Sequence, residues 1–196
     1  MVEGIQAAAG QLGIDPKTVI AEAPSAQPAT PQPSQEQVDA VSKMSPDEQV
    51  AMIRGMVDKL QARMDADGSD VQGWLRLAQS RMVLGEPDRA RETYQKALAL
   101  HPDDPALLKG YAALLIGPAP AGADLPQVGD QAKELLTKAV KLQPDDPEIW
   151  WFLGIRALQD GHKDEARSAW EKVLAGIDPS RPEYQDIKNR IDSLGS

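Results

Sequence analysis

The apolar side chains of this chain recur at three- and four-residue intervals over most of its length, which is the pattern of amphipathic helices. One series follows a helix start in which Ser45 and Glu48 form a capping box, and it consists of Met52, Ile53, Met56, Val57, Leu60 and Met64. A second series follows Ser180 and Glu183, which predict another capping box, and it consists of Tyr184, Ile187, Ile191 and Leu194. The pattern therefore predicts helices over residues 45–66 and 181–194.

Between these two helices the sequence repeats itself, and an internal repeat decides the fold class before any local feature does. HPDDP at 101–105 returns as QPDDP at 143–147. Trp74 and Leu108 are 34 residues apart, whereas Leu108 and Trp150 are 42 apart, so the middle unit carries eight extra residues. They fall in the Pro-, Gly- and Ala-rich stretch IGPAPAGADLPQVGD, which predicts a loop between the two helices of that unit.

The repeated residues match the tetratricopeptide pattern W-x2-L-G-x2-Y, A-x3-F and P. Small side chains are expected where paired helices cross, so that the backbones can approach, at Ala78, Ala112, Gly154, Ala90, Ala132 and Ala166. Asp104 and Asp146 each precede a proline at a helix start, where a carboxylate caps free amide groups. The chain departs from the pattern at Arg81 and Leu115, which replace the usual Tyr, and at Asp178-Pro179, which shifts the last Pro by one.

The fold class predicted from these features is all-α, a tetratricopeptide-repeat right-handed superhelix of three repeats flanked by N- and C-terminal capping helices. The repeats are expected at 71–104, 105–146 and 147–179, within a domain covering 44–196. Residues 1–43 form a mobile N-terminal segment, because prolines at 24, 28, 31 and 33 stand among small or polar residues that cannot build a core.

Composition and charge exclude several functions. With 30 acidic against 21 basic residues the formal charge is −9, which disfavours nucleic acid and anionic membrane surfaces. The chain has no cysteine, and His101 and His162 both stand in turns, where a solvated histidine is expected. We therefore expect no catalytic residue, no metal site, no cofactor and no enzyme activity. The longest apolar run, Ala112 to Ile116, is far too short to span a membrane, so any membrane attachment needs a portion absent from this chain.

The concave side of such arrays is lined by the first helix of each repeat. The expected peptide-binding groove consists of Gln72, Leu75, Gln79, Met82, Lys109, Ala113, Ile116, Glu148, Trp151, Ile155 and Leu158. Its apolar floor suits an amphipathic helix better than a bare carboxylate, for which Lys and Asn would be needed. Trp151 is the first expected contact, because Trp150 already takes the packing position. The alternative is that Trp151 is buried under the last helix.

The segment MIRGMVDKLQARMDADGSDVQGWLRLAQSRMVLGEPDRARETYQKALAL, from Met52 to Leu100, is followed by a stretched middle unit and by DDPEIWWFLG. In this order and spacing the chain resembles the periplasmic repeat domain of the CcmI (CycH) family of cytochrome c maturation. The resemblance implies a periplasmic domain tethered to the inner membrane in the full-length protein. It also implies an apocytochrome c holdase that grips the client's amphipathic C-terminal helix and delivers it to the haem-ligation complex. The alternative is a generic scaffold that joins folded subunits of an envelope or cytoplasmic complex.

Overall fold

The computed structural model describes residues 45–195, and this part of the chain contains helices and no strand. The expected N-terminal segment 1–43, with its proline-rich linker, lies outside the described residues, and the domain limits remain predictions. The helices are α3 (Pro46–Ala66), α4 (Val71–Val83), α5 (Pro87–Leu100), α6 (Pro105–Ile116), α7 (Asp130–Leu142), α8 (Pro147–Gln159), α9 (Lys163–Ala175) and α10 (Pro182–Ser193). Each falls within one of the predicted helices or repeats.

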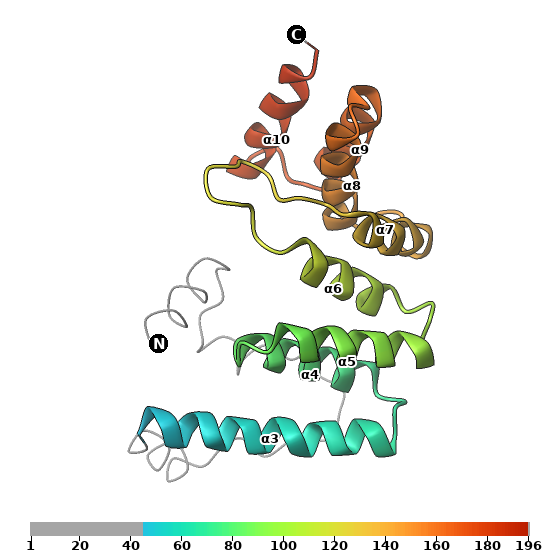
Figure 1. Cartoon of the computed structure of the whole chain (residues 1–196). Coiled ribbons are helices and arrows are strands. Elements are labelled where there is room, and N and C mark those ends of the chain that lie inside the picture. Colours follow the sequence, from blue (N-terminus) through green and yellow to red (C-terminus); the bar gives the residue numbers. More distant parts are fainter. Residues whose placement is uncertain (1–44, 196) are drawn as a thin grey trace. The chain divides into compact units, whose positions relative to one another are not determined.

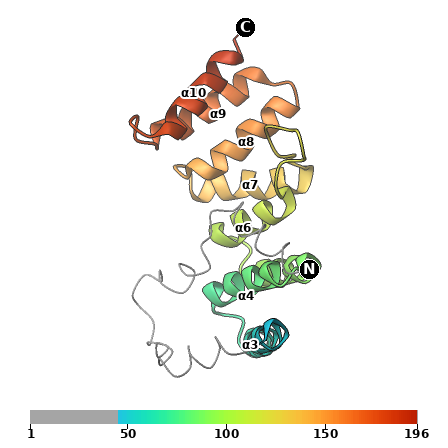
Figure 2. The ribbon, with the colours of Figure 1, turned by 90° about the vertical axis from the view of Figure 1, so that its left-hand side faces the viewer.

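The chain divides after Met56, inside α3, into two units. The described residues of the first unit, 45–56, are the start of α3. In the second unit the closest pairs are α4 with α5, α6 with α7, and α8 with α9, while α10 packs on α9. Figures 1 and 2 show α4 to α10 following one another, each helix beside the next. This pairing confirms the tetratricopeptide-repeat fold.

Local capping follows the sequence at three of the four helix starts where a side-chain cap was predicted. The Glu48 carboxylate accepts from the Ser45 amide at 2.8 Å and the Glu48 amide donates to the Ser45 hydroxyl at 3.3 Å, which is the predicted capping box. Asp104 and Asp146 accept amide hydrogen bonds in the first turns of α6 and α8, as predicted. The box predicted at Ser180 is wrong, because Ser180 bonds to Asp178 instead and α10 begins without a side-chain cap.

The repeated tryptophans hold equivalent places in the first and third repeats. Trp74 Nε1 donates to the Gly68 carbonyl at 2.9 Å, and Trp150 Nε1 donates to the Pro144 carbonyl at 2.6 Å. In both cases the indole ties its helix to the turn before it. The Gly68 carbonyl also lies 2.7 Å from His101 Nε2, so His101 is partly buried and bonded, contrary to the solvated turn residue expected from sequence.

The small residues predicted at the helix crossings are buried in the structure. Ala78, Ala90, Ala112 and Ala166 are fully buried, and Ala132 is 1% exposed. At Gly154 in α8 an added Cβ atom would run into the indole of Trp170, which donates from Nε1 to the Trp151 carbonyl at 3.2 Å. Gly154 therefore fixes the spacing of α8 and α9.

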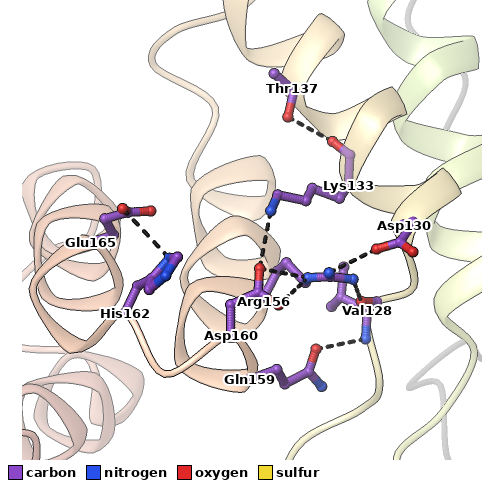
Figure 3. Close-up of polar contacts among 9 residues, drawn as sticks. All are labelled: Val128, Asp130, Lys133, Thr137, Arg156, Gln159, Asp160, His162 and Glu165. Carbon is purple, nitrogen blue, oxygen red and sulfur yellow. Dashed lines mark hydrogen bonds and ion pairs between the residues drawn. The ribbon is translucent and has the colours of Figure 1, made fainter.

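The eight-residue insertion is part of a loop, 117–129, whose end is fastened to the last turn of α8 (Figure 3). Arg156 Nη1 donates to the Val128 carbonyl at 2.9 Å, and the Val128 amide donates to the Gln159 side chain at 3.2 Å. Val128 is 3% exposed and belongs to the same core cluster as Ile155. The insertion thus contributes to the core of the third repeat.

Asp160 connects α7 to the residues of α8 that hold the loop end. Its carboxylate lies 3.0 Å from Arg156 and 3.0 Å from Lys133, while Arg156 also reaches Asp130 at 2.7 Å (Figure 3). The hydrogen bonds from Arg156 and then from Lys133 lower the pKa of Asp160 to about 2. One carboxylate therefore links α7, α8 and, through Arg156, the end of the loop.

We expect Gly154→Ala to destabilise the domain by about 1–3 kcal/mol, because the new methyl group overpacks the Trp170 ring. Alanine has the better helix propensity, so packing and propensity act in opposite directions here. Gly55→Ala in α3 is the matched control, since nothing lies within 4 Å of a Cβ atom there, and it should stabilise the protein by about 0.5–1 kcal/mol. Urea unfolding measures the free energy of unfolding of both variants. A stabilised Gly154→Ala would contradict the packing argument.

Asp160 also predicts a pH dependence of stability. Because its pKa is lower in the folded chain than in the unfolded chain, its contribution is present above the usual value near 3.8 and is lost as pH falls toward about 2. The urea midpoint of Asp160→Asn should therefore lie below that of the unsubstituted chain at pH 6, and the gap should close between pH 4 and about 2. Asp186→Asn, at an exposed position of α10, should show no such gap. A gap independent of pH would contradict the ionic origin.

Candidate functional site

The predicted groove residues differ in accessibility along the array. In α4, Gln72 and Gln79 are exposed, Leu75 is partly buried and Met82 is 44% exposed, so this helix presents a continuous accessible stripe. In α6, Ala113 is also exposed. Glu148 at the start of α8 is exposed as well, so the exposed residues of the predicted groove are Gln72, Gln79, Met82, Ala113 and Glu148.

Two of the eleven predicted groove residues lie in the core. Ile155 is 0% exposed and Ile116 is 7% exposed, and both belong to the core cluster that also contains Val128 of the loop. Their side chains offer no surface to a bound peptide in this structure, because the same cluster includes the loop and buried residues of α10. Leu158 is partly buried against the same cluster.

Lys109 and Glu148 are brought together by the fold. Lys109 Nζ lies 2.8 Å from Asp146 and 3.0 Å from Glu148, so it connects α6 to the start of α8. Burial of Lys109 opposes its charge, but the hydrogen bonds to Asp146 and Glu148 outweigh this effect and raise its pKa. These ion pairs connect the second repeat to the third.

Trp151 is placed between two helices. Its ring lies 5.6 Å from that of Trp170 in α9 at a tilt of 30°, and the Arg190 guanidinium of α10 lies 6.0 Å from the ring centroid. The residue is partly buried. The packing expected under the alternative interpretation is thus present, and the remaining exposed part of the ring is what a ligand can reach.

A cavity of about 490 Å³ lies elsewhere, between α7 and α9 above α8. Its apolar floor is made by Trp150, Leu153, Ala157 and Ala169. The charged side chains around it are Lys133, Arg156, Asp160, Asp164, Glu165 and Lys172, and the Lys172 ammonium sits 3.6 Å above the Trp150 ring. None of the predicted groove residues lines this cavity.

A smaller cavity of about 330 Å³ occupies the equivalent place in the first repeat, between α3 and α5. Trp74 and Trp150 are 76 residues apart, and the same offset relates Gln61 to Thr137, Arg81 to Ala157 and Thr93 to Ala169. Each of these three positions carries a smaller side chain in the third repeat. The cavity of the third repeat is therefore equivalent to the first-repeat site, and it is larger because smaller side chains line it.

The prediction of the groove from sequence missed this cavity, although the tetratricopeptide pattern contains its signal. The position of the usual Tyr is occupied by Arg81, Leu115 and Ala157 in the three repeats. Arg81 and Leu115 are large side chains, whereas Ala157 leaves the space between neighbouring second helices unfilled. Comparing the third repeat with the pattern at this position would have located the cavity.

Within residues 45–195 no group of three or more His, Cys, Asp or Glu side chains is placed to hold a metal ion. None of the helices from α3 to α10 combines the length and hydrophobicity needed to cross a bilayer.

Comparison with known proteins agrees with the repeat architecture. The family model described as "Cytochrome c-type biogenesis protein H TPR domain" matches residues 21–184. CycH of Rhizobium meliloti is 38% identical over 65 residues, which are 33% of this chain and 17% of that protein. CycH of Bradyrhizobium diazoefficiens is 42% identical over 57 residues, 29% of this chain and 15% of that protein. The aligned segments thus span about a sixth of the length of these relatives.

Solved structures support the fold. A crystal structure of MamA superposes with a TM-score of 0.55 at 18% identity and covers 77% of this chain and 83% of that chain. A second structure, MamA MSR-1 C2, gives a TM-score of 0.52 at 22% identity over 76% of this chain and 81% of that chain. Since the family model covers most of the sequence and the helices pair as its repeats require, the chain belongs to the tetratricopeptide-repeat domain family of cytochrome c-type biogenesis protein H, the CcmI (CycH) family.

Proposed function

We propose that this domain is a non-catalytic, polypeptide-binding module of cytochrome c maturation that holds apocytochrome c through an amphipathic C-terminal helix. The observation that carries the proposal is the accessible stripe of α4 in a chain of this family. Leu75 and Met82 provide apolar contacts there, while Gln72 and Gln79 provide amide groups at the edge. A helix with anchors at i, i+3, i+4 and i+7 matches this alternation.

The binding surface proposed here is narrower than the eleven-residue groove. Gln72, Leu75, Gln79, Met82 and Ala113 form its accessible part, and the exposed portion of Trp151 extends it. Lys109 and Glu148 are paired with each other, so they contribute mainly to repeat packing. Ile116 and Ile155 support the surface from within the core.

The family also supports a place in the cell envelope. We propose a periplasmic location with attachment to the inner membrane in the full-length protein, and delivery of the client to the haem-ligation complex. The net charge of −9 favours a client helix with basic residues beside its apolar anchors.

Titration with a peptide of an apocytochrome C-terminal helix should give saturable binding at tens of micromolar or tighter, about −6 to −7 kcal/mol. Met82→Glu should weaken it by about tenfold, because a charge would replace an apolar contact. Leu142→Glu is the matched control, since Met82 and Leu142 are both 44% exposed but lie on a first and a second helix respectively. Calorimetric titration measures all three affinities.

Trp151→Ala should weaken the binding of the same peptide. Because the Trp151 ring packs on Trp170, thermal unfolding of this variant must be measured as a control. No binding by the unsubstituted chain would reject the holdase. Recovery of folded partners without apocytochrome in a pull-down would then favour the scaffold alternative. An equal loss of peptide affinity in Met82→Glu and Leu142→Glu would mean that the peptide binds elsewhere on the domain.

A further inference from the structure

Arg81 shows which side chain the fold accepts between neighbouring second helices. It is only 9% exposed, and its guanidinium donates from Nη1 to the Arg89 carbonyl at 2.8 Å and from Nη2 to Gln61 Oε1 at 2.6 Å. The arginine therefore crosses from α4 to both α3 and α5. In the first repeat this side chain occupies part of the site and leaves the smaller cavity of about 330 Å³.

The third repeat has hydrogen-bond acceptors at the corresponding sequence positions but lacks the arginine. Thr137 stands at the position of Gln61, and its hydroxyl, which donates to the Lys133 carbonyl at 2.7 Å, retains lone pairs that can accept. Glu165 stands at the position of Arg89. The Arg89 carbonyl also accepts from the Thr93 hydroxyl at 2.8 Å, whereas Ala169 has no hydroxyl to place on the Glu165 carbonyl. The vacant site can thus accept at least the two hydrogen bonds that Arg81 makes.

The charges around the cavity favour a cationic occupant at the α9 rim. Lys133 and Arg156 both lie 3.0 Å from Asp160, and Lys172 lies over the Trp150 ring, so these cations already have partners. Among residues 45–195 Asp164 makes no ion pair, and Glu165, 73% exposed, has only His162 at 3.6 Å (Figure 3). Asp164 and Glu165 are therefore the carboxylates available to a guanidinium.

We propose that the cavity between α7 and α9 is a second docking site, which receives an arginine side chain from a basic polypeptide segment. The arginine stem lies on the floor made by Leu153, Ala157 and Ala169. Its guanidinium takes the place of that of Arg81, with Asp164 and Glu165 beside it. This site is separate from the α4 surface and does not depend on the proposed client.

The test uses the full 196-residue chain and three blocked pentapeptides, each with one central residue, arginine, lysine or phenylalanine, among alanines. Amide shifts of Thr137, Ala157 and Ala169 are followed by nitrogen-15 NMR. The arginine peptide should give saturating shifts, with the lysine and phenylalanine peptides weaker by about tenfold or more, because only the planar fork matches two acceptors at once. Equal binding by either of these peptides, or no saturating shift, would overturn the proposal.

The chain itself supplies the matched variants. Ala157→Arg combined with Thr137→Gln rebuilds the first-repeat arrangement, so it should abolish the arginine-dependent shifts and leave binding to the α4 surface unchanged. Binding that persists in this folded double variant would refute the site.

Asp164→Asn and Glu165→Gln keep the test decisive if the double variant does not fold, since both positions are exposed. Each should reduce the affinity for the arginine peptide several-fold, and the pair together should reduce it further. Unchanged affinity in the doubly neutralised variant would contradict the role of the rim. Absence of arginine binding would not bear on the peptide surface proposed on α4. Absence of apocytochrome binding would likewise not bear on the arginine site.

Discussion

The close packing of α8 on α9 requires that the backbone of Gly154 meet the indole of Trp170 without an intervening side chain. Gly110 of α6 meets the Tyr94 ring of α5 in a similar way, and Gly68 and Gly73 lie equally close to the side chains of Leu100 and Met64. Helices held this close bury the neighbouring small residues completely. Because these contacts hold the helices at a set spacing, the size of the side chains that face the space between helices decides whether that space is filled or stays open.

The position of the usual tyrosine shows the consequence. Arg81 occupies part of the space in the first repeat and makes hydrogen bonds to two other helices, and Leu115 packs against the core in the second. Ala157 is too small to do either, and a cavity of about 490 Å³ results. Burial lowers the pKa of the Arg81 guanidinium, the expected effect of desolvating a cation. The same backbone frame thus holds a buried cation in one repeat and an open site in another.

The third repeat also uses the inserted loop and the last helix to cover surface that a ligand would otherwise reach. Arg156 and Gln159 fasten the loop end at Val128, and Arg190 of α10 lies over the Trp151 ring. As a result the accessible residues of the proposed peptide surface concentrate on α4 and α6. A repeat array whose end is closed by its own chain keeps its apolar residues out of water there.

The sequence by itself determined the helices, their pairing and the family, because the repeat unit is local. A capping aspartate, a proline in the first turn and a small residue at each crossing act within one or two helices, and each was predicted in place at Asp104, Asp146 and Gly154. Only the tertiary structure decided which apolar residues of the first helices remain accessible. Burial of Ile155 and the packing of Trp151 depend on side chains from α9, α10 and the loop, which helical periodicity within α8 cannot specify.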